Sequence, residues 1–256
     1  MGKNGTDVAK NAADMILADD NFVTIEKAVK NGRHIYENIK RAVHFLLATN
    51  IGEIVVIFFG LLLGWETPLL AIQLLWINLV TDSLPAIALG MEEADKDIMH
   101  KKPHSSRKSL FADGLWSKII LEGTMIGVLT LVAYSIGIKM YNLTIARTMA
   151  FTSLSILELL HSINVRTDKS LFTINPFKNM YLVGAIISGI VLQVIVTIVP
   201  GLNRLFEVTS LNNSQWLIVW CISIMPIIIV ELQKKINEIK YGKTVFTKDN
   251  LLIIKK

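Results

Sequence analysis

Long apolar stretches alternate with short polar ones along most of this chain. Stretches of about 18 or more apolar residues, the length a helix needs to cross ~30 Å of hydrocarbon, occur six times. They cover residues 42–64, 69–90, 115–138, 146–163, 180–199 and 214–232. Helices are the expected form, because a helix satisfies its own backbone hydrogen bonds where water is absent. The pattern therefore predicts an all-α polytopic membrane protein with six transmembrane helices.

The residues before the first apolar stretch are mostly polar. Residues 1–41 are too few to bury a core of their own, so we expect them to form the edge of a larger cytosolic body. Thr24 is placed to cap a helix whose apolar positions continue, with no proline, into the first span. The sequence thus predicts one long helix over 24–64, a stalk that enters the bilayer directly.

The positive charges predict an orientation. Of the 26 Lys and Arg residues, all but Lys139, Arg147 and Arg204 fall on the cytoplasmic side if the N-terminus is cytoplasmic. This positive-inside bias places both termini in the cytoplasm. The net charge of +5 comes with no basic stripe of interleaved aromatic residues, so we expect no nucleic-acid partner. With 52% hydrophobic residues, the expected partner is the lipid bilayer.

Polar residues stand in the middle of the first two spans, where lipid disfavours them. They are Asn50 and Glu53 in the first span, and Asn78, Thr81 and Asp82 in the second. Spacings of three and four residues put the members of each set on one helical face. Pro85 lacks the N–H that would bond the carbonyl of Thr81, so this backbone oxygen is freed beside them. Each set therefore presents several oxygen atoms on one side of its helix.

Glu158 in the fourth span adds a third membrane carboxylate to Glu53 and Asp82. An ionised carboxylate at mid-helix costs about 2.5–3.5 kcal/mol on the insertion scale, so three of them call for compensation. Carboxylates, amide oxygens, a hydroxyl and a freed carbonyl form the hard-oxygen set that Ca²⁺ favours. Hydrogen bonding between helices is an equal alternative for Asn50 and Asn78. For Glu53 and Asp82 the alternative is a proton-sharing or structural pair, and for Glu158 an interfacial position.

Other ionisable residues in the spans are assigned to structure. Glu122 follows Lys118 by one turn, the spacing of a helical ion pair. We place His44 at the membrane interface, near the cytoplasmic entry of its span. His161 shares a face with Glu158 and is expected to support it or simply to pack.

Three stretches resemble the C-terminal part of P-type cation-transporting ATPases, and most closely the sarcoplasmic-reticulum type of calcium pump. The end of that family's phosphorylation domain is similar to MGKNGTDVAKNAADMILADDNF. Its stalk and fifth membrane helix are similar to GRHIYENIKRAVHFLLATNIGE, and its sixth to the highly specific string QLLWINLVTDSLPAIALG. The resemblance covers essentially the entire chain. It implies a short remnant of an α/β cytosolic domain followed by the fifth to tenth membrane helices.

The resemblance also implies which residues bind the transported ion. By position, the family's calcium ligands match Asn50, Glu53, Asn78, Thr81, Asp82 and Glu158, each the expected residue type. One departure is Ser83, where calcium pumps of this type commonly have glycine. A less flexible segment at that position would shift the affinity or the ion preference.

The implied organisation has four parts: the end of the phosphorylation domain (1–23), the stalk helix (24–41), the six-helix cation-transport domain (42–232) and a cytoplasmic tail (233–256). No DKTG-type phosphorylation motif and no GDGxND stretch occurs in the sequence. We therefore expect no catalytic or cofactor-binding residue, and a chain that alone neither hydrolyses ATP nor completes both ion sites. The expected partner is the N-terminal part of the pump, comprising the actuator, nucleotide and phosphorylation domains, which bind ATP and Mg²⁺, and the first four membrane helices.

The function that the resemblance implies is ATP-driven export of Ca²⁺ from the cytosol by a multi-pass membrane protein, in the plasma membrane if the source is prokaryotic. The alternatives are a P-type pump for Na⁺, H⁺ or Mn²⁺, a stand-alone channel or secondary transporter, and an inactive fragment. A secondary transporter would show internal symmetry or a complete site, and the sequence shows neither.

Overall fold

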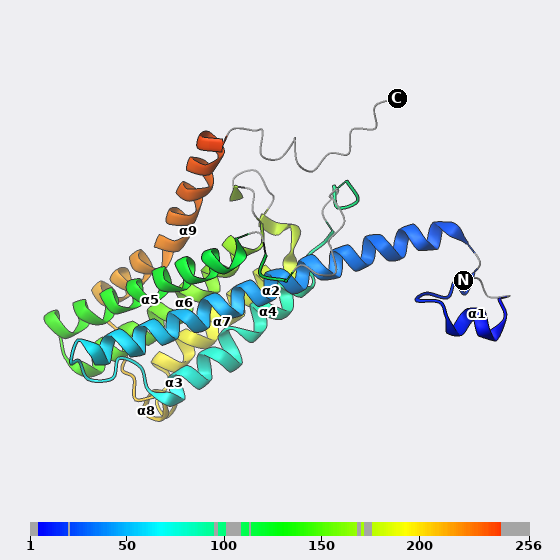
Figure 1. Cartoon of the computed structure of the whole chain (residues 1–256). Coiled ribbons are helices and arrows are strands. Elements are labelled where there is room, and N and C mark those ends of the chain that lie inside the picture. The colour runs from blue at the N-terminus through cyan, green and yellow to red at the C-terminus, as the bar shows by residue number, and fades with distance from the viewer. Residues whose placement is uncertain are drawn as a thin grey trace.

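The computed structural model describes residues 5–19, 21–94, 97–100, 109–112, 114–167, 170–171 and 176–241. Its long helices lie side by side in one bundle, and α2 extends beyond this bundle toward α1 (Figure 1). Their bounds are α1 Asp7–Asn11, α2 Phe22–Leu62, α3 Ala71–Trp76, α4 Ser83–Gly90, α5 Leu115–Met140, α6 Leu143–Val165, α7 Met180–Ile198, α8 Leu202–Leu205 and α9 Asn213–Tyr241. A π-helix, η1, spans Ile77–Thr81, and a 3₁₀ turn, η3, spans Pro176–Lys178.

Six helical segments of the described chain are long and apolar enough to cross a membrane. They coincide with the six predicted spans, so the prediction of an all-α, multi-pass membrane protein is confirmed. The second span is composite: α3, η1 and α4 together form one 20-residue segment from Ala71 to Gly90.

A single helix of 41 residues, α2, includes both the expected stalk and the first span. Its start differs from the prediction, because the cap is Asn21, whose side-chain oxygen accepts from the Val23 N–H at 3.0 Å. Thr24 lies inside the helix and donates its hydroxyl to Asp19 Oδ2 at 2.6 Å. Asn is among the strongest N-cap residues, and this start leaves the Thr24 hydroxyl free to bond outside the helix.

The π-helix interrupts the second span at the polar residues. The Asp82 N–H donates to the carbonyl of Ile77, five residues back, at 2.9 Å. Two side chains bond to the same turn: the Thr81 hydroxyl donates to the Ile77 carbonyl at 2.9 Å, and the Ser83 hydroxyl to the Asn78 carbonyl at 3.1 Å. A π turn widens a helix locally and is frequent at functional sites. The sequence predicted that Pro85 frees the carbonyl of Thr81, but it did not predict this π-helix.

Helix α6 is the centre of the bundle. Of its most apolar window, 72% is buried, against 33–50% for the other five spans. It packs against α2, α4, α5, α7 and α9. Large side chains such as Met149, Phe151 and Leu157 are completely buried on it. Any polar residue in the inner part of α6 is therefore shielded from lipid by protein.

Helices α2 and α5 approach closely at glycines. A Cβ atom added at Gly127 would lie 2.5 Å from Val55 Cγ1 and 2.8 Å from the carbonyl oxygen of Gly52. One added at Gly123 would lie 2.5 Å from the carbonyl oxygen of Ala48. Small residues permit such approaches between membrane helices. The glycines thus set how near α5 stands to the polar face of α2.

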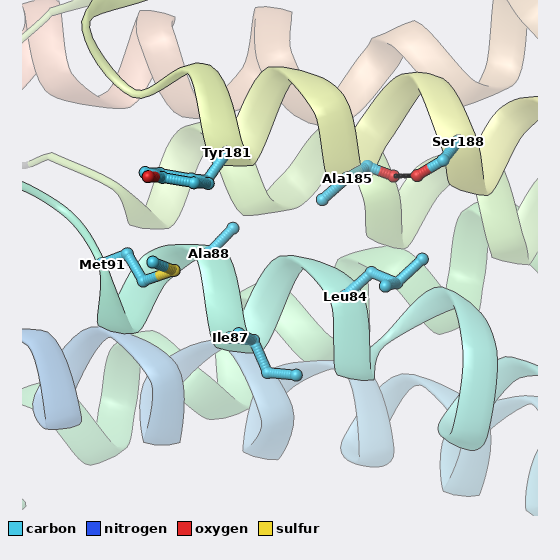
Figure 2. Close-up of a pocket in the computed structure, with 7 residues that line it drawn as sticks. All are labelled: Leu84, Ile87, Ala88, Met91, Tyr181, Ala185 and Ser188. Atoms are coloured by element: carbon cyan, nitrogen blue, oxygen red, sulfur yellow. Dashed lines mark hydrogen bonds between the residues drawn. The ribbon is translucent and has the colours of Figure 1, made fainter.

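A shallow groove of about 200 Å³ runs between α4 and α7 (Figure 2). Its lining is mostly apolar and consists of Leu84, Ile87, Ala88, Met91, Tyr181, Ala185 and Ser188. The Ser188 hydroxyl is bonded within its own helix, to the carbonyls of Gly184 and Ala185. None of the described residues that line the groove is charged, so it is distinct from the polar site described next.

Candidate cation-binding site

The structure brings the predicted carboxylates together from three elements. Glu53 lies on α2, Asp82 directly follows η1, and Glu158 lies on α6. Their exposed fractions are 8%, 0% and 0%. The carboxyl groups of Glu53, Asp82 and Glu158 lie close enough to one another to interact electrostatically. Three acidic groups thus share one buried region in the middle of the bundle.

Glu53 is bound by the amide of Asn78. The Asn78 Nδ2 donates to both carboxylate oxygens, at 2.7 and 2.8 Å, and also to the carbonyl of Leu74 at 3.1 Å. The Asn50 Nδ2 donates to the carbonyl of Leu46 at 2.6 Å. The side-chain oxygens of both asparagines accept no hydrogen bond within the described residues. The first two spans are therefore linked directly across the site.

Asp82 is bound by Thr49, a residue that was not predicted from the sequence. The Thr49 hydroxyl donates to Asp82 Oδ2 at 2.7 Å, and Thr49 is completely buried on α2. Asp82 Oδ1 has no hydrogen-bond partner among the described residues. A signal was present in the sequence, because Thr49 stands four residues before Glu53 and so shares its helical face. Thr49 orients one carboxylate oxygen and leaves the other available.

Glu158 carries two unpartnered oxygens. Its carboxyl is completely buried, and neither Oε1 nor Oε2 has a hydrogen-bond partner in the part of the chain described. Leaving a buried charged group unsatisfied is costly unless a counter-charge or a proton compensates it. Together with Asp82 Oδ1 and the amide oxygens of Asn50 and Asn78, these atoms are hard-oxygen ligands that fit a cation such as Ca²⁺.

The side chains of the site do not surround one point in the way that a formed metal site would. Among the described residues, no group of three or more His, Cys, Asp or Glu side chains has the spacing to hold a metal ion. In addition, the Asn78 amide directs its nitrogen, and not its oxygen, toward Glu53. For both residues to bind one cation, Asn78 has to turn its oxygen toward Glu53. The Thr81 hydroxyl donates to the carbonyl of Ile77, which leaves the lone pairs of its oxygen available to a cation.

Three ionisable residues assigned to structure form a cluster. Glu122 Oε2 lies 2.6 Å from His44 Nε2 and 3.4 Å from His161 Nε2. His44, which we expect near the cytoplasmic entry of its span, is 6% exposed and faces Glu122 inside the bundle. Glu122 itself is 4% exposed. The i,i+4 spacing from Lys118 gave no indication of these two partners, which come from other helices.

At one end of the bundle, Glu92 connects α2, α6 and α7. Its Oε2 accepts from Arg166 Nε at 2.9 Å and from Asn179 Nδ2 at 2.7 Å. Its backbone carbonyl accepts from Asn38 Nδ2 on α2 at 2.9 Å. Glu92 follows α4, so this junction ties the part of α2 beyond the polar site to the helix that follows Asp82.

Comparisons with known proteins all match this chain to cation-transporting ATPases. Residues 66–236 match the family model described as "Cation transporting ATPase, C-terminus". The chain is 44% identical over 228 residues to the calcium-transporting ATPase of Bacillus subtilis, covering 88% of this chain and 26% of that relative. It is 44% identical over 252 residues to calcium-transporting ATPase 1 of Bacillus cereus, covering 91% and 28%. A calcium-transporting ATPase of Plasmodium falciparum is 34% identical over 279 residues, with 91% of this chain and 23% of the relative covered.

The chain thus spans about a quarter of the length of the curated relatives it matches. The matched region includes five of the six candidate membrane-spanning helices completely, and the first, Phe22–Leu62, lies outside it. With the family model covering more than half of the sequence, this chain belongs to the cation-transporting ATPases and corresponds to their C-terminal membrane part.

Proposed function

We propose that this chain is the cation-binding membrane part of an ATP-driven P-type pump that exports Ca²⁺ from the cytosol. The observation that carries the proposal is the buried group formed by Glu53, Asp82 and Glu158, in which three carboxylate oxygens have no hydrogen-bond partner among the described residues. Three carboxylates in one low-dielectric region need a cation or protons to compensate them. Relatives of this chain are named calcium-transporting ATPases, which supports Ca²⁺ as the cargo.

The proposed ligands are the six oxygen-bearing residues Asn50, Glu53, Asn78, Thr81, Asp82 and Glu158. Ca²⁺ takes six to eight oxygen ligands in flexible geometry, which suits carboxylates and amides from separate helices. The smaller Mg²⁺ demands near-ideal octahedral geometry and gives up its water reluctantly. Oxygen ligands from three separate segments, α2, η1 with the adjoining Asp82, and α6, therefore suit Ca²⁺ better than Mg²⁺.

In the proposed mechanism, α2 transmits motion from the cytosol to the site. Residues 1–23 would belong to the phosphorylation domain, 24–41 to the stalk, 42–232 to the transport domain and 233–256 to a cytoplasmic tail. A continuous helix is a rigid rod, so a rotation of the cytosolic body moves Asn50 and Glu53 relative to Asp82. ATP and Mg²⁺ would bind the N-terminal part of the pump. In a prokaryotic source the membrane would be the plasma membrane.

Equilibrium binding of ⁴⁵Ca²⁺ to the purified chain in nanodiscs tests the proposal, because all six proposed ligands lie within it. We expect saturable binding that survives a large excess of Na⁺ and Mg²⁺. Glu158→Gln and Asp82→Asn should each abolish it. Glu66→Gln is the matched control, since Glu66 is a carboxylate with a 71% exposed side chain. Binding of Mn²⁺ or Na⁺ in preference to Ca²⁺ would identify another cargo, and binding unaffected by both site variants would exclude this site.

A further inference from the structure

A second cluster of ionisable side chains lies inside the bundle, apart from the six proposed ligands. His44 on α2 and His161 on α6 both face Glu122 Oε2 on α5, at 2.6 and 3.4 Å. The three residues are 6%, 0% and 4% exposed, respectively. One carboxylate oxygen therefore contacts an imidazole from each of two helices that also carry proposed ligands.

Both histidines lie on the same side of the cation site. His44 precedes Asn50 by six residues on α2, and His161 follows Glu158 by three on α6. These helices contain the first and fourth of six successive spans, so they run in opposite directions and the two positions fall at the same end. At 1.5 Å per residue, the cluster is displaced from the ligands by about 4.5 Å along α6 and about 9 Å along α2.

His161 has Glu122 as its closest polar contact. Neither of its ring nitrogens has a well-aligned hydrogen-bond partner among the described residues. The His44 ring stands against it in a T-shaped arrangement, with the centroids 6.5 Å apart and the planes at 83°. Without the carboxylate, buried His44 would lose its hydrogen-bond partner and buried His161 its 3.4 Å contact with Glu122, and a buried polar group left unpaired is costly. The turn of α6 that bears His161 also bears Glu158, so Glu158 would shift with it.

We propose that Glu122 is a positioning residue for the cation site. Through its hydrogen bond to His44 and its contact with His161, the carboxylate fixes Glu158 on α6 relative to Glu53 on α2. This role rests on the proposed function, in which Glu53 and Glu158 bind Ca²⁺. Packing alone does not require such a cluster, because an ionisable group inside a membrane protein costs free energy that an apolar side chain would not.

Equilibrium Ca²⁺ binding to the purified chain tests this role with two variants. Glu122→Ala removes the shared acceptor, and we expect the Kd to rise about tenfold, within the usual range of coupling between sites. The number of sites per folded chain should stay unchanged. Glu122→Gln keeps an oxygen for one imidazole N–H and offers an N–H to the other ring, so its Kd should stay within about threefold of wild type.

Glu231→Ala is the matched control. Glu231 is also a buried carboxylate, 9% exposed, and accepts from the Ser170 hydroxyl at 2.6 Å and the Leu171 N–H at 3.0 Å. It lies outside the cluster, so its loss should leave the Kd unchanged. The proposal is wrong if Glu122→Ala lowers the number of sites at an unchanged Kd, or if Glu231→Ala raises the Kd equally.

Two further measurements separate this inference from the proposed function. If the wild-type chain does not bind Ca²⁺, the proposed function fails. The ¹⁵N NMR spectrum of histidine-labelled protein still tests the cluster, since the Nε2 resonances of His44 and His161 must both move in Glu122→Ala. If Glu122→Ala does not fold, His44→Asn and His161→Asn replace it. Each removes one of the two contacts, and an unchanged Kd in both variants would overturn the proposal.

Discussion

The Thr49 hydroxyl determines which oxygen of Asp82 is available to a cation. It donates to Oδ2, while Oδ1 accepts no hydrogen bond from the described residues. Thr49→Val keeps the shape of the side chain and removes the donor, so the carboxylate loses its fixed orientation. We expect the Kd for Ca²⁺ to rise about tenfold, the size of a hydrogen bond to a charged group. Thr49→Ser retains the hydroxyl and should bind as wild type, and equal Kd values for all three proteins would contradict this role.

Asp19 is an ionisable group outside the membrane whose environment predicts a pH effect. The Thr24 hydroxyl, with help from the Asn21 N–H, holds the pKa of this carboxyl below its ordinary value. Because the folded pKa is lowered, the interaction stabilises the start of α2 above the ordinary Asp value of about 3.9 and is lost as pH falls through the folded value.

NMR titration of the Asp19 carboxyl carbon checks this expectation. The midpoint should lie below the ordinary value in the wild-type chain and move upward in Thr24→Val, which lacks the donor. The resonances of Val23 and Thr24 should follow the same titration, because both lie in the first turn of α2. A midpoint that Thr24→Val leaves in place would show that the hydroxyl does not stabilise the carboxylate.

The spacing between helices α2 and α5 depends on glycines, which have no side chain. Gly127 lets α5 approach α2 so closely that a Cβ atom would meet both Val55 and the backbone of Gly52. Gly127→Ala should therefore push the helices apart, at the cost of about 1–3 kcal/mol typical of overpacking. Because α2 carries Asn50 and Glu53, we also expect weaker Ca²⁺ binding.

Thermal unfolding in detergent measures the effect, with Gly184→Ala as the control. A Cβ atom at Gly184 meets nothing within 4 Å, so alanine there should be neutral or stabilising, since it favours a helix by about 1 kcal/mol over glycine. Similar unfolding temperatures for the two variants would show that the α2–α5 spacing is not limited by Gly127.

At the scale of the whole chain, the features that could be predicted from the sequence are those that depend on the order of residues within one helix. The six spans follow from apolar length, and the sharing of faces by Asn50 and Glu53 follows from helical spacing, without knowledge of how helices pack. The contacts of Thr49 with Asp82 and of His44 with Glu122 join helices distant in sequence, and no periodicity encodes them. The π turn was likewise not predicted from the sequence, because Pro85 indicates only that the carbonyl of Thr81 is freed.

The orientation of the chain in the membrane is the remaining consequence of its charge pattern. Only Lys139, Arg147 and Arg204 fall on the side opposite the N-terminus, so the positive-inside rule places the start of α2 and the end of α9 in the cytoplasm. The proposed mechanism requires the same orientation, because α2 has to reach a cytosolic ATP-binding body. A green fluorescent protein fused after residue 256 should therefore fluoresce, whereas alkaline phosphatase fused after Arg204 should be active. The reverse pattern would be incompatible with export from the cytosol, since the stalk would then face away from ATP.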